Sequence, residues 1–144
     1  MKKEIPETTI KTLIIRAKAM LLRSYIPYSN FAVGASLLSS SGNIYDGCNV
    51  ENAAYGPSNC AERTAFFKAV SEGDTKFDAI AIVGGPGRHV ADFCPPCGVC
   101  RQVMAEFCRP DEFQIIVAKS EEDYKIYTLE ELLPLGFGAS DLEK

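Results

Sequence analysis

The sequence predicts an α/β protein in which helices cover both faces of one mixed sheet, giving three layers in the order α/β/α. Helical and strand-like apolar spacings alternate along the chain in the order α-β-β-α-β-α-β-β-α. Strands separated by helices imply right-handed crossovers between parallel neighbours. No repeat or linker interrupts this order, and 144 residues suffice for one domain, residues 1–144, with its own core.

The first half of the chain is expected to hold a helix, a hairpin and a second helix. A helix over residues 8–24 follows from five apolar residues at helical spacing, namely Ile10, Leu13, Ile14, Ala17 and Leu21. Two β-rich runs flank the turn "SSSGN", where Gly42 and Asn43 can take positive φ, which predicts a β-hairpin. The stretch "NCAERTAFFKAV", residues 59–70, then reads as an amphipathic helix that ends near Gly73.

The second half alternates strands with short helices. Residues 77–84 and 113–119 are short, apolar and β-branched, as is typical of strands buried on both faces. Between them lie a loop over 84–96, rich in Gly and Pro, and a helix over 97–108. Residues 121–127 suggest a turn with a short strand, and 128–134 a short helix whose Thr128 and Glu131 fit a capping box.

Composition excludes several classes of protein. With 47% apolar and 24% charged residues the chain is neither disordered nor fibrous. A net charge of −4 without clustered basic residues disfavours a nucleic-acid partner. No apolar run reaches the ~20 residues of a membrane span, and the N-terminus lacks the apolar segment of a signal peptide. We therefore expect a cytoplasmic protein, in which the six cysteines form no disulfide framework and the clustered ones bind metal or are redox-active. Cys48 and Cys108 suit small core residues.

The helix at residues 59–70 opens with Cys60, Glu62 and Arg63 within five positions. A helix N-terminus favours the thiolate form of a cysteine, which makes Cys60 a candidate metal ligand. The alternative is a capping box between Asn59 and Glu62, with Cys60 as a small buried residue. The stretch "PCGVCRQ" places Cys97 at another helix start and Cys100 one turn later on the same side.

Cys60, Cys97 and Cys100 together form a candidate zinc site with three protein ligands and one open position, the pattern of a catalytic zinc. Glu62 would stand beside the water in the open position, where a carboxylate can shuttle protons. Three thiolates on Zn²⁺ sum to a negative charge, which weakens the activation of water. We therefore expect Arg63, three residues after Cys60, to withdraw charge from a thiolate, and Arg101 to offer a second donor.

At this point the sequence resembles the zinc-dependent cytidine deaminases of the small homotetrameric type. The motifs "FAVGA", "NVENAAYG", "CAERTA", "PCGVCRQV" and "ELLP" occur in the family's order over nearly the whole chain. The resemblance implies a cytidine deaminase-like fold, and deamination of cytidine, and of deoxycytidine, to uridine and ammonia in pyrimidine salvage. It makes Cys60, Cys97 and Cys100 the zinc ligands and Glu62 the general acid and base.

The resemblance also implies a set of residues that bind the nucleoside. Phe31 would stack near the base, Asn49 and Glu51 would hold the ribose hydroxyls, and Ala61 would contribute to the pocket. Tyr55 and Phe137 would close the pocket of a neighbouring subunit in a homotetramer. The residues alone leave other interpretations open, because Phe31 also suits a strand core and Asn49 and Glu51 a solvated strand end.

Rival functions follow from the same motifs. A relative on the same scaffold could deaminate another nucleoside such as blasticidin S, because pocket shape is not readable from sequence. In a non-catalytic zinc module, Cys94 would close the coordination sphere as a fourth thiolate. The overlapping "CPPC" of Cys94 and Cys97 also resembles a redox pair, but that function leaves Glu62 unexplained. The only histidine, His89, is expected to face solvent in the loop.

Overall fold

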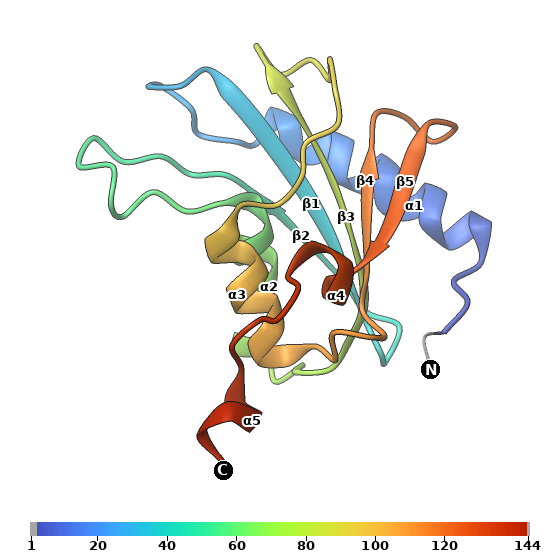
Figure 1. Cartoon of the computed structure of the whole chain (residues 1–144). Helices are drawn as coiled ribbons and strands as arrows, with labels where there is room; N and C mark the ends of the chain where they lie inside the picture. The colour runs from blue at the N-terminus through green and yellow to red at the C-terminus, as the bar shows by residue number, and fades with distance from the viewer. Residues whose placement is uncertain (1–2, 144) are drawn as a thin grey trace.

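The computed structural model describes residues 3–143 and centres on one five-stranded mixed sheet (Figure 1). The strand order is β2-β1-β3-β4-β5. β3 and β4 pair in parallel, whereas the other neighbours are antiparallel. The strands are β1 (Phe31–Ser39), β2 (Ile44–Cys48), β3 (Phe77–Pro86), β4 (Gln114–Ala118) and β5 (Tyr124–Thr128). The predicted mixed sheet is thus confirmed.

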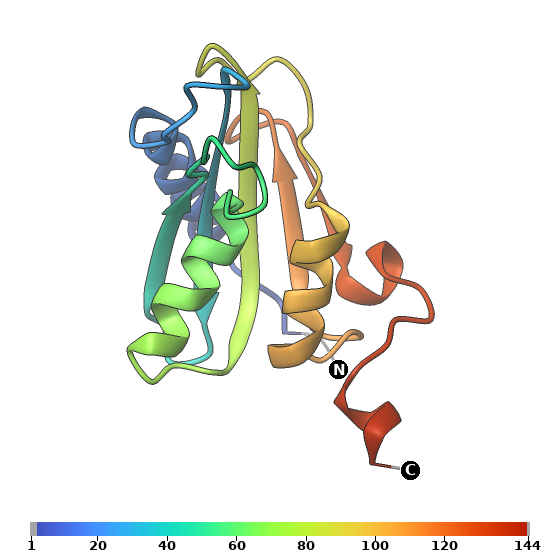
Figure 2. The ribbon, with the colours of Figure 1, turned by 90° about the vertical axis from the view of Figure 1, so that its left-hand side faces the viewer.

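Helices lie on both faces of this sheet, which confirms the predicted three layers (Figures 1 and 2). α1 (Glu7–Ala19) covers one face and continues into the 3₁₀ turn η1 (Met20–Leu22). α2 (Ala61–Ser71), α3 (Gly98–Phe107) and the short α4 (Leu129–Leu132) cover the other. A further short helix that the sequence did not predict, α5 (Ala139–Leu142), projects beyond the sheet near the C-terminus. Within residues 3–143 no helix has the length and apolarity to span a membrane.

Local sequence signals account for most of these boundaries. The predicted capping box is present at α4, where Thr128 Oγ1 accepts from the N–H of Glu131, and Glu131 Oε1 accepts from the N–H of Thr128. In the β1–β2 turn only Gly42 of the two predicted residues takes positive φ, at 95°. The five predicted apolar residues of the first helical segment are all buried, although that segment ends at Leu22 rather than Ser24.

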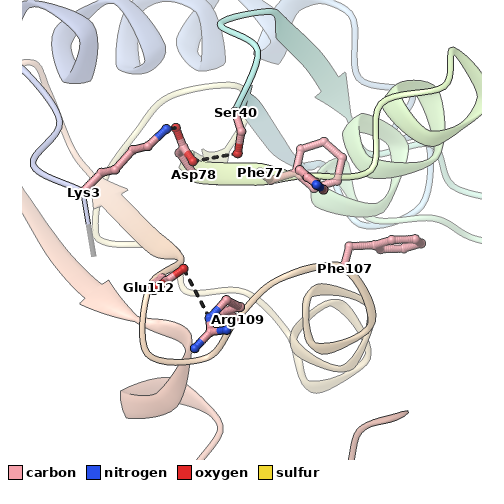
Figure 3. Close-up of a pocket in the computed structure, with 8 residues that line it drawn as sticks. Lys3, Ser40, Phe77, Asp78, Phe107, Arg109 and Glu112 are labelled. Atoms are coloured by element: carbon pink, nitrogen blue, oxygen red, sulfur yellow. Dashed lines mark hydrogen bonds and ion pairs between the residues drawn. The ribbon is translucent and has the colours of Figure 1, made fainter. Parts of the chain in front are cut away.

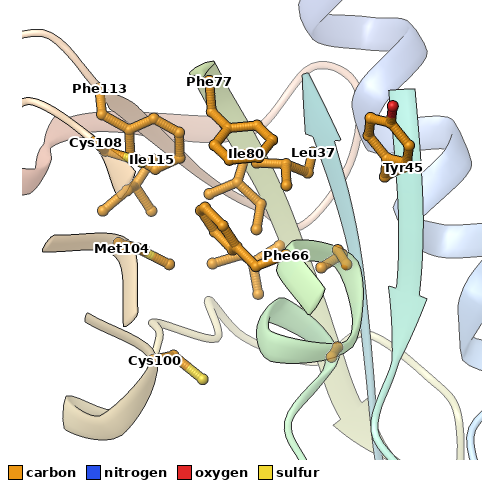
Figure 4. Close-up of a cluster of buried hydrophobic side chains, with 14 of the residues drawn as sticks. Leu37, Tyr45, Phe66, Phe77, Ile80, Cys100, Met104, Cys108, Phe113 and Ile115 are labelled. Atoms are coloured by element: carbon orange, nitrogen blue, oxygen red, sulfur yellow. The ribbon is translucent and has the colours of Figure 1, made fainter. Parts of the chain in front are cut away.

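The core is divided by the sheet into two clusters. The cluster under α2 and α3 centres on Phe66, whose ring contacts those of Phe77, Phe107 and Phe113 (Figure 4). Cys100 and Met104 extend it along α3. The other cluster joins α1 to the opposite face of β3 and β4. Both strands were predicted to be buried on both faces, and their residues from 79 to 85 and from 114 to 118 are buried.

Gly47 permits a close approach of α2 to β2. A Cβ atom at Gly47 would lie 2.3 Å from the carbonyl oxygen of Ala61 and 2.7 Å from the amide nitrogen of Ala65. Both of those atoms belong to the backbone of α2, which cannot move aside as a flexible side chain can. The absence of a side chain at this position therefore fixes where the first turn of α2, and with it Cys60 and Glu62, can lie.

We predict that Gly47→Ala destabilises the protein by about 1–3 kcal/mol, because overpacking forces the first turn of α2 away from the sheet. The midpoint of thermal unfolding measures the effect. Gly138→Ala is the matched control, since a Cβ there meets no atom within 4 Å. Equal melting temperatures for the two variants would contradict the steric argument.

Candidate active site

Three cysteine sulfurs converge where α2 and α3 begin. Cys60 is the N-cap of α2 and Cys97 the N-cap of α3, while Cys100 lies in the first turn of α3. Their Sγ atoms all lie within 4.8 Å of one another, and those of Cys60 and Cys97 are 3.6 Å apart. Tetrahedral zinc with Zn–S bonds of about 2.3 Å needs sulfurs about 3.8 Å apart. The three thiols are therefore positioned to bind a zinc ion.

Cys94 does not belong to this group of sulfurs. Among residues 3–143, the set of potential ligand atoms within 4.8 Å of one another at this place contains Cys60, Cys97 and Cys100 alone. Cys94 packs instead against β3, where a Cβ at Gly84 would lie 2.9 Å from its sulfur. Burial raises the pKa of the Cys94 thiol to about 12, which disfavours the thiolate that a redox-active cysteine needs. The arrangement fits neither the closed four-thiolate site nor the redox pair.

Glu62 is buried beside the three sulfurs. It is the second residue of α2, its exposed fraction is 4%, and it lines the same cavity as Cys60. Burial, reinforced by the negative charge of Cys60, raises the pKa of Glu62 to about 7. The capping-box alternative is wrong, because the N-cap of α2 is Cys60 rather than Asn59 and no side chain caps this helix. A buried carboxyl group without a capping role can instead exchange a proton near neutral pH.

Arg63 makes the contact that the charge argument predicted. Its Nη2 donates to Cys60 Sγ over 3.2 Å. Hydrogen bonds from Cys100, Arg63 and Cys97 to this sulfur lower the pKa of Cys60 to about 5. Within the described chain, Arg63 Nε is buried and has no hydrogen-bond partner. The guanidinium group is thus held at the cysteine cluster and not at the surface.

The expectation for Arg101 is wrong. Its Nε donates to the carbonyl oxygen of Pro96, and its Nη1 donates to that of Leu132, each over 2.8 Å. Cys100 faces the core, and the next residue of a helix points about 100° away from it. Arg101 therefore ties the start of α3 to α4 instead of contacting a sulfur.

A cavity of about 350 Å³ unites the cysteine cluster with the predicted sugar-binding residues. Glu62, Arg63, Asn49 and Glu51 all line it, together with Cys60 and Cys97. The remaining lining residues were not predicted to bind substrate, and they are Val33, Ser58, Asn59, Cys94 and Pro95. Val33 belongs to the motif "FAVGA" and Pro95 to "CPPC", whereas no quoted motif contains Ser58.

The other predicted site residues lie outside the lining of this cavity. Phe31 begins β1 with 40% of its surface exposed, and its carbonyl oxygen accepts from Asn49 Nδ2 over 2.8 Å. Ala61 is fully buried. Tyr55, held at φ 61°, is 73% exposed. Phe137 is 58% exposed and lines a separate cavity beside Leu133 and Leu135.

A larger cleft of about 530 Å³ lies elsewhere on the molecule and contains none of the predicted site residues (Figure 3). Four of its charged groups form two ion pairs: Lys3 Nζ lies 3.1 Å from Asp78 Oδ2, and Arg109 Nε lies 3.3 Å from Glu112 Oε2. Ser40 Oγ also donates to Asp78 over 2.8 Å. His89 is exposed in the loop after β3, as expected.

A three-thiolate metal site with an open position, a buried carboxylate beside it and a cavity in front of it together define a zinc-dependent hydrolytic enzyme. Comparison with known proteins narrows this class. The sequence model of the "cytidine and deoxycytidylate deaminase zinc-binding region" matches residues 7–116. The chain belongs to this deaminase family.

Individual relatives agree with this assignment. A cytidine deaminase of Sporosarcina psychrophila is 46% identical over 133 residues, which cover 92% of this chain and 94% of the relative. One of Halalkalibacterium halodurans is 50% identical over 119 residues, 83% of this chain and 86% of the relative. The crystal structure of cytidine deaminase from Burkholderia pseudomallei superimposes with a TM-score of 0.79 at 44% identity, covering 88% of this chain and 97% of that one.

We predict that serine at each of the three clustered cysteines abolishes zinc binding, because a neutral hydroxyl is a poor zinc ligand. Serine at the other three cysteines should leave one zinc ion per chain. Elemental analysis of the purified variants measures the ratio. The first group is Cys60, Cys97 and Cys100, and the second is Cys48, Cys94 and Cys108. Loss of zinc from Cys94→Ser as complete as from Cys97→Ser would overturn this ligand set.

Proposed function

We propose that this protein catalyses the zinc-dependent hydrolytic deamination of cytidine, and of deoxycytidine, to uridine and ammonia. One observation carries the proposal: Glu62 is buried next to three clustered thiols, in a cavity that Asn49 and Glu51 also line. The relatives named cytidine deaminase, at 46% and 50% identity, support the choice of substrate. Deamination of another nucleoside such as blasticidin S, and a non-catalytic zinc module, are not favoured.

Each part of the site has a role in this reaction. Cys60, Cys97 and Cys100 would hold the zinc ion, which would supply a Lewis acid to acidify a water molecule. Glu62 takes a proton from the attacking water, passes it to ring N3 and later helps to protonate the leaving amine. Its pKa of about 7 suits both steps, because the carboxyl group can accept and return a proton near neutral pH. Asn49 and Glu51 bind the ribose, and Phe31 stacks near the base.

We further propose that residues 1–144 form one catalytic domain and that it acts in pyrimidine salvage in the cytoplasm as a homotetramer. Exposed apolar side chains are available for contacts between subunits. Among those in the described chain are Leu22, Tyr25, Tyr55, Leu135 and Phe137. In the assembled form, Tyr55 and Phe137 would close the cavity of a neighbouring subunit.

Glu62→Gln is expected to retain zinc and fold but to lose activity by about 10²–10⁴-fold, because glutamine can form hydrogen bonds but cannot carry the proton. An ultraviolet assay of cytidine loss, with zinc measured on the same preparation, tests both parts. Wild-type protein that carries zinc without consuming cytidine would refute the proposed function. Near-normal turnover by Glu62→Gln would refute only the role of Glu62.

Arg63→Gln is expected to keep zinc but to lower turnover by about 10–100-fold, the usual cost of losing a group that supports a metal ligand. Without the guanidinium on Cys60 the site is more negative, so the acidic limb of the pH–rate profile should move to higher pH. Adding Cys60→His to this variant removes one thiolate charge and should recover part of the activity, whereas Cys60→His alone should not help. An unshifted profile for Arg63→Gln would contradict the charge argument.

A further inference from the structure

The carboxylate of Glu51 is held by one turn of the chain just before β1. Its Oε1 accepts from the backbone N–H groups of Tyr28 and Ser29, each over 3.1 Å. Its Oε2 accepts from the hydroxyl of Ser29. This hydroxyl is also the leading reason that the pKa of Glu51 falls below its usual range. Glu51 is thus kept ionised and in a fixed orientation at the edge of the cavity.

These contacts leave Glu51 little capacity for a ligand. A carboxylate offers about four acceptor positions, two on each oxygen. The two N–H groups occupy Oε1, and the Ser29 hydroxyl takes one position on Oε2. One acceptor position on Oε2 remains, and the hydrogen bond from Ser29 determines the direction in which it points. A sugar hydroxyl that donates to Glu51 must therefore approach along that direction.

The same serine also fixes the start of β1. Ser29 Oγ accepts a hydrogen bond from the N–H of Phe31 over 3.0 Å. Asn30, between these two residues, adopts a left-handed φ of 55°. Asn49 holds the other side of this segment, since its Oδ1 accepts from the N–H of Val33 and its Nδ2 donates to the carbonyl of Phe31. Of the two side chains expected to bind the sugar, Asn49 is thus bonded to the backbone of Phe31 directly, and Glu51 is linked to it through the Ser29 hydroxyl.

We infer that Ser29 is a positioning residue. Its hydroxyl directs the free acceptor of Glu51 toward a sugar hydroxyl and holds the backbone of Phe31 in a fixed position relative to Glu51. The inference rests on the proposed function, because it takes a pyrimidine nucleoside as the ligand of the cavity. Ser29 itself need not touch the substrate. It acts through Glu51, so removing the Ser29 hydroxyl weakens binding of cytidine more than binding of a nucleoside that lacks the 2′ and 3′ hydroxyls.

The test compares Ser29→Ala, the conservative Ser29→Thr and the control Ser40→Ala on cytidine and 2′,3′-dideoxycytidine. Ser40 is matched to Ser29, because its hydroxyl also donates to a carboxylate, that of Asp78, in the separate cleft (Figure 3). Ser29→Ala should reduce the kcat/KM ratio of cytidine to the dideoxynucleoside by about tenfold, mainly through KM. Ser29→Thr and Ser40→Ala should keep the wild-type ratio.

A double-mutant cycle with Glu51→Gln separates positioning from a general structural role. If Ser29 acts through Glu51, Ser29→Ala should lower the cytidine preference no further in the Glu51→Gln background. Equal losses on both nucleosides, no loss on either, or full additivity with Glu51→Gln would overturn the inference. So would failure of Ser29→Thr to retain the ratio while the protein stays folded.

Binding of the product separates this inference from the proposed function. Calorimetry with uridine and 2′,3′-dideoxyuridine reports recognition of the sugar without turnover. If wild-type protein fails to deaminate cytidine, but Ser29→Ala still loses about tenfold of its preference for uridine, the proposed reaction fails and the role of Ser29 stands. If turnover is normal and the preference for uridine is unchanged, the reaction stands and the role of Ser29 fails.

Discussion

The site depends on two helices that begin at the same point in space. Cys60 and Cys97 occupy the N-cap positions of α2 and α3, and both have extended backbone, with φ/ψ of −77°/157° and −68°/166°. Both sulfurs therefore lie close to a helix N-terminus. Two partial positive charges brought together in this way would repel one another. Thiolates between the two helix termini offset that repulsion. The guanidinium of Arg63 adds a third positive group, which contacts the sulfur of Cys60. The two helix N-termini and Arg63 thus supply positive charge that offsets the negative charge of a three-thiolate metal site.

The sheet fixes where these helix starts lie. α2 reaches the cluster because Gly47 lets its first turn press onto β2, and the loop before α3 packs Cys94 over Gly84 of β3. Glu62 is buried because of this packing, and burial is the main reason that the pKa of Glu62 is raised. The protonation behaviour of the candidate catalytic group is therefore a property of how helix and sheet meet, more than of its immediate neighbours.

Much of this arrangement could be predicted from the sequence, because it follows from local rules. Helical spacing located α1, and the cysteine pattern at two helix starts predicted a metal cluster whose geometry the structure provides. Contacts between distant segments were beyond such rules. Arg101 was expected at a sulfur but donates to Leu132, 31 residues away, and the bond from Ser29 to Glu51 spans 22 residues. The short α5 has only four residues and no strong periodic signal.

The separation of the cysteines along the chain has a consequence for folding. Cys60 and Cys97 are 37 residues apart, and the whole of α2 and β3 lies between them. An ion that joins them closes this segment into a loop, as a disulfide would, and a loop of that length restricts the unfolded chain by about 4 kcal/mol. In a reducing compartment a disulfide would not persist. A metal centre can thus link these two segments as a disulfide links segments of a secreted protein.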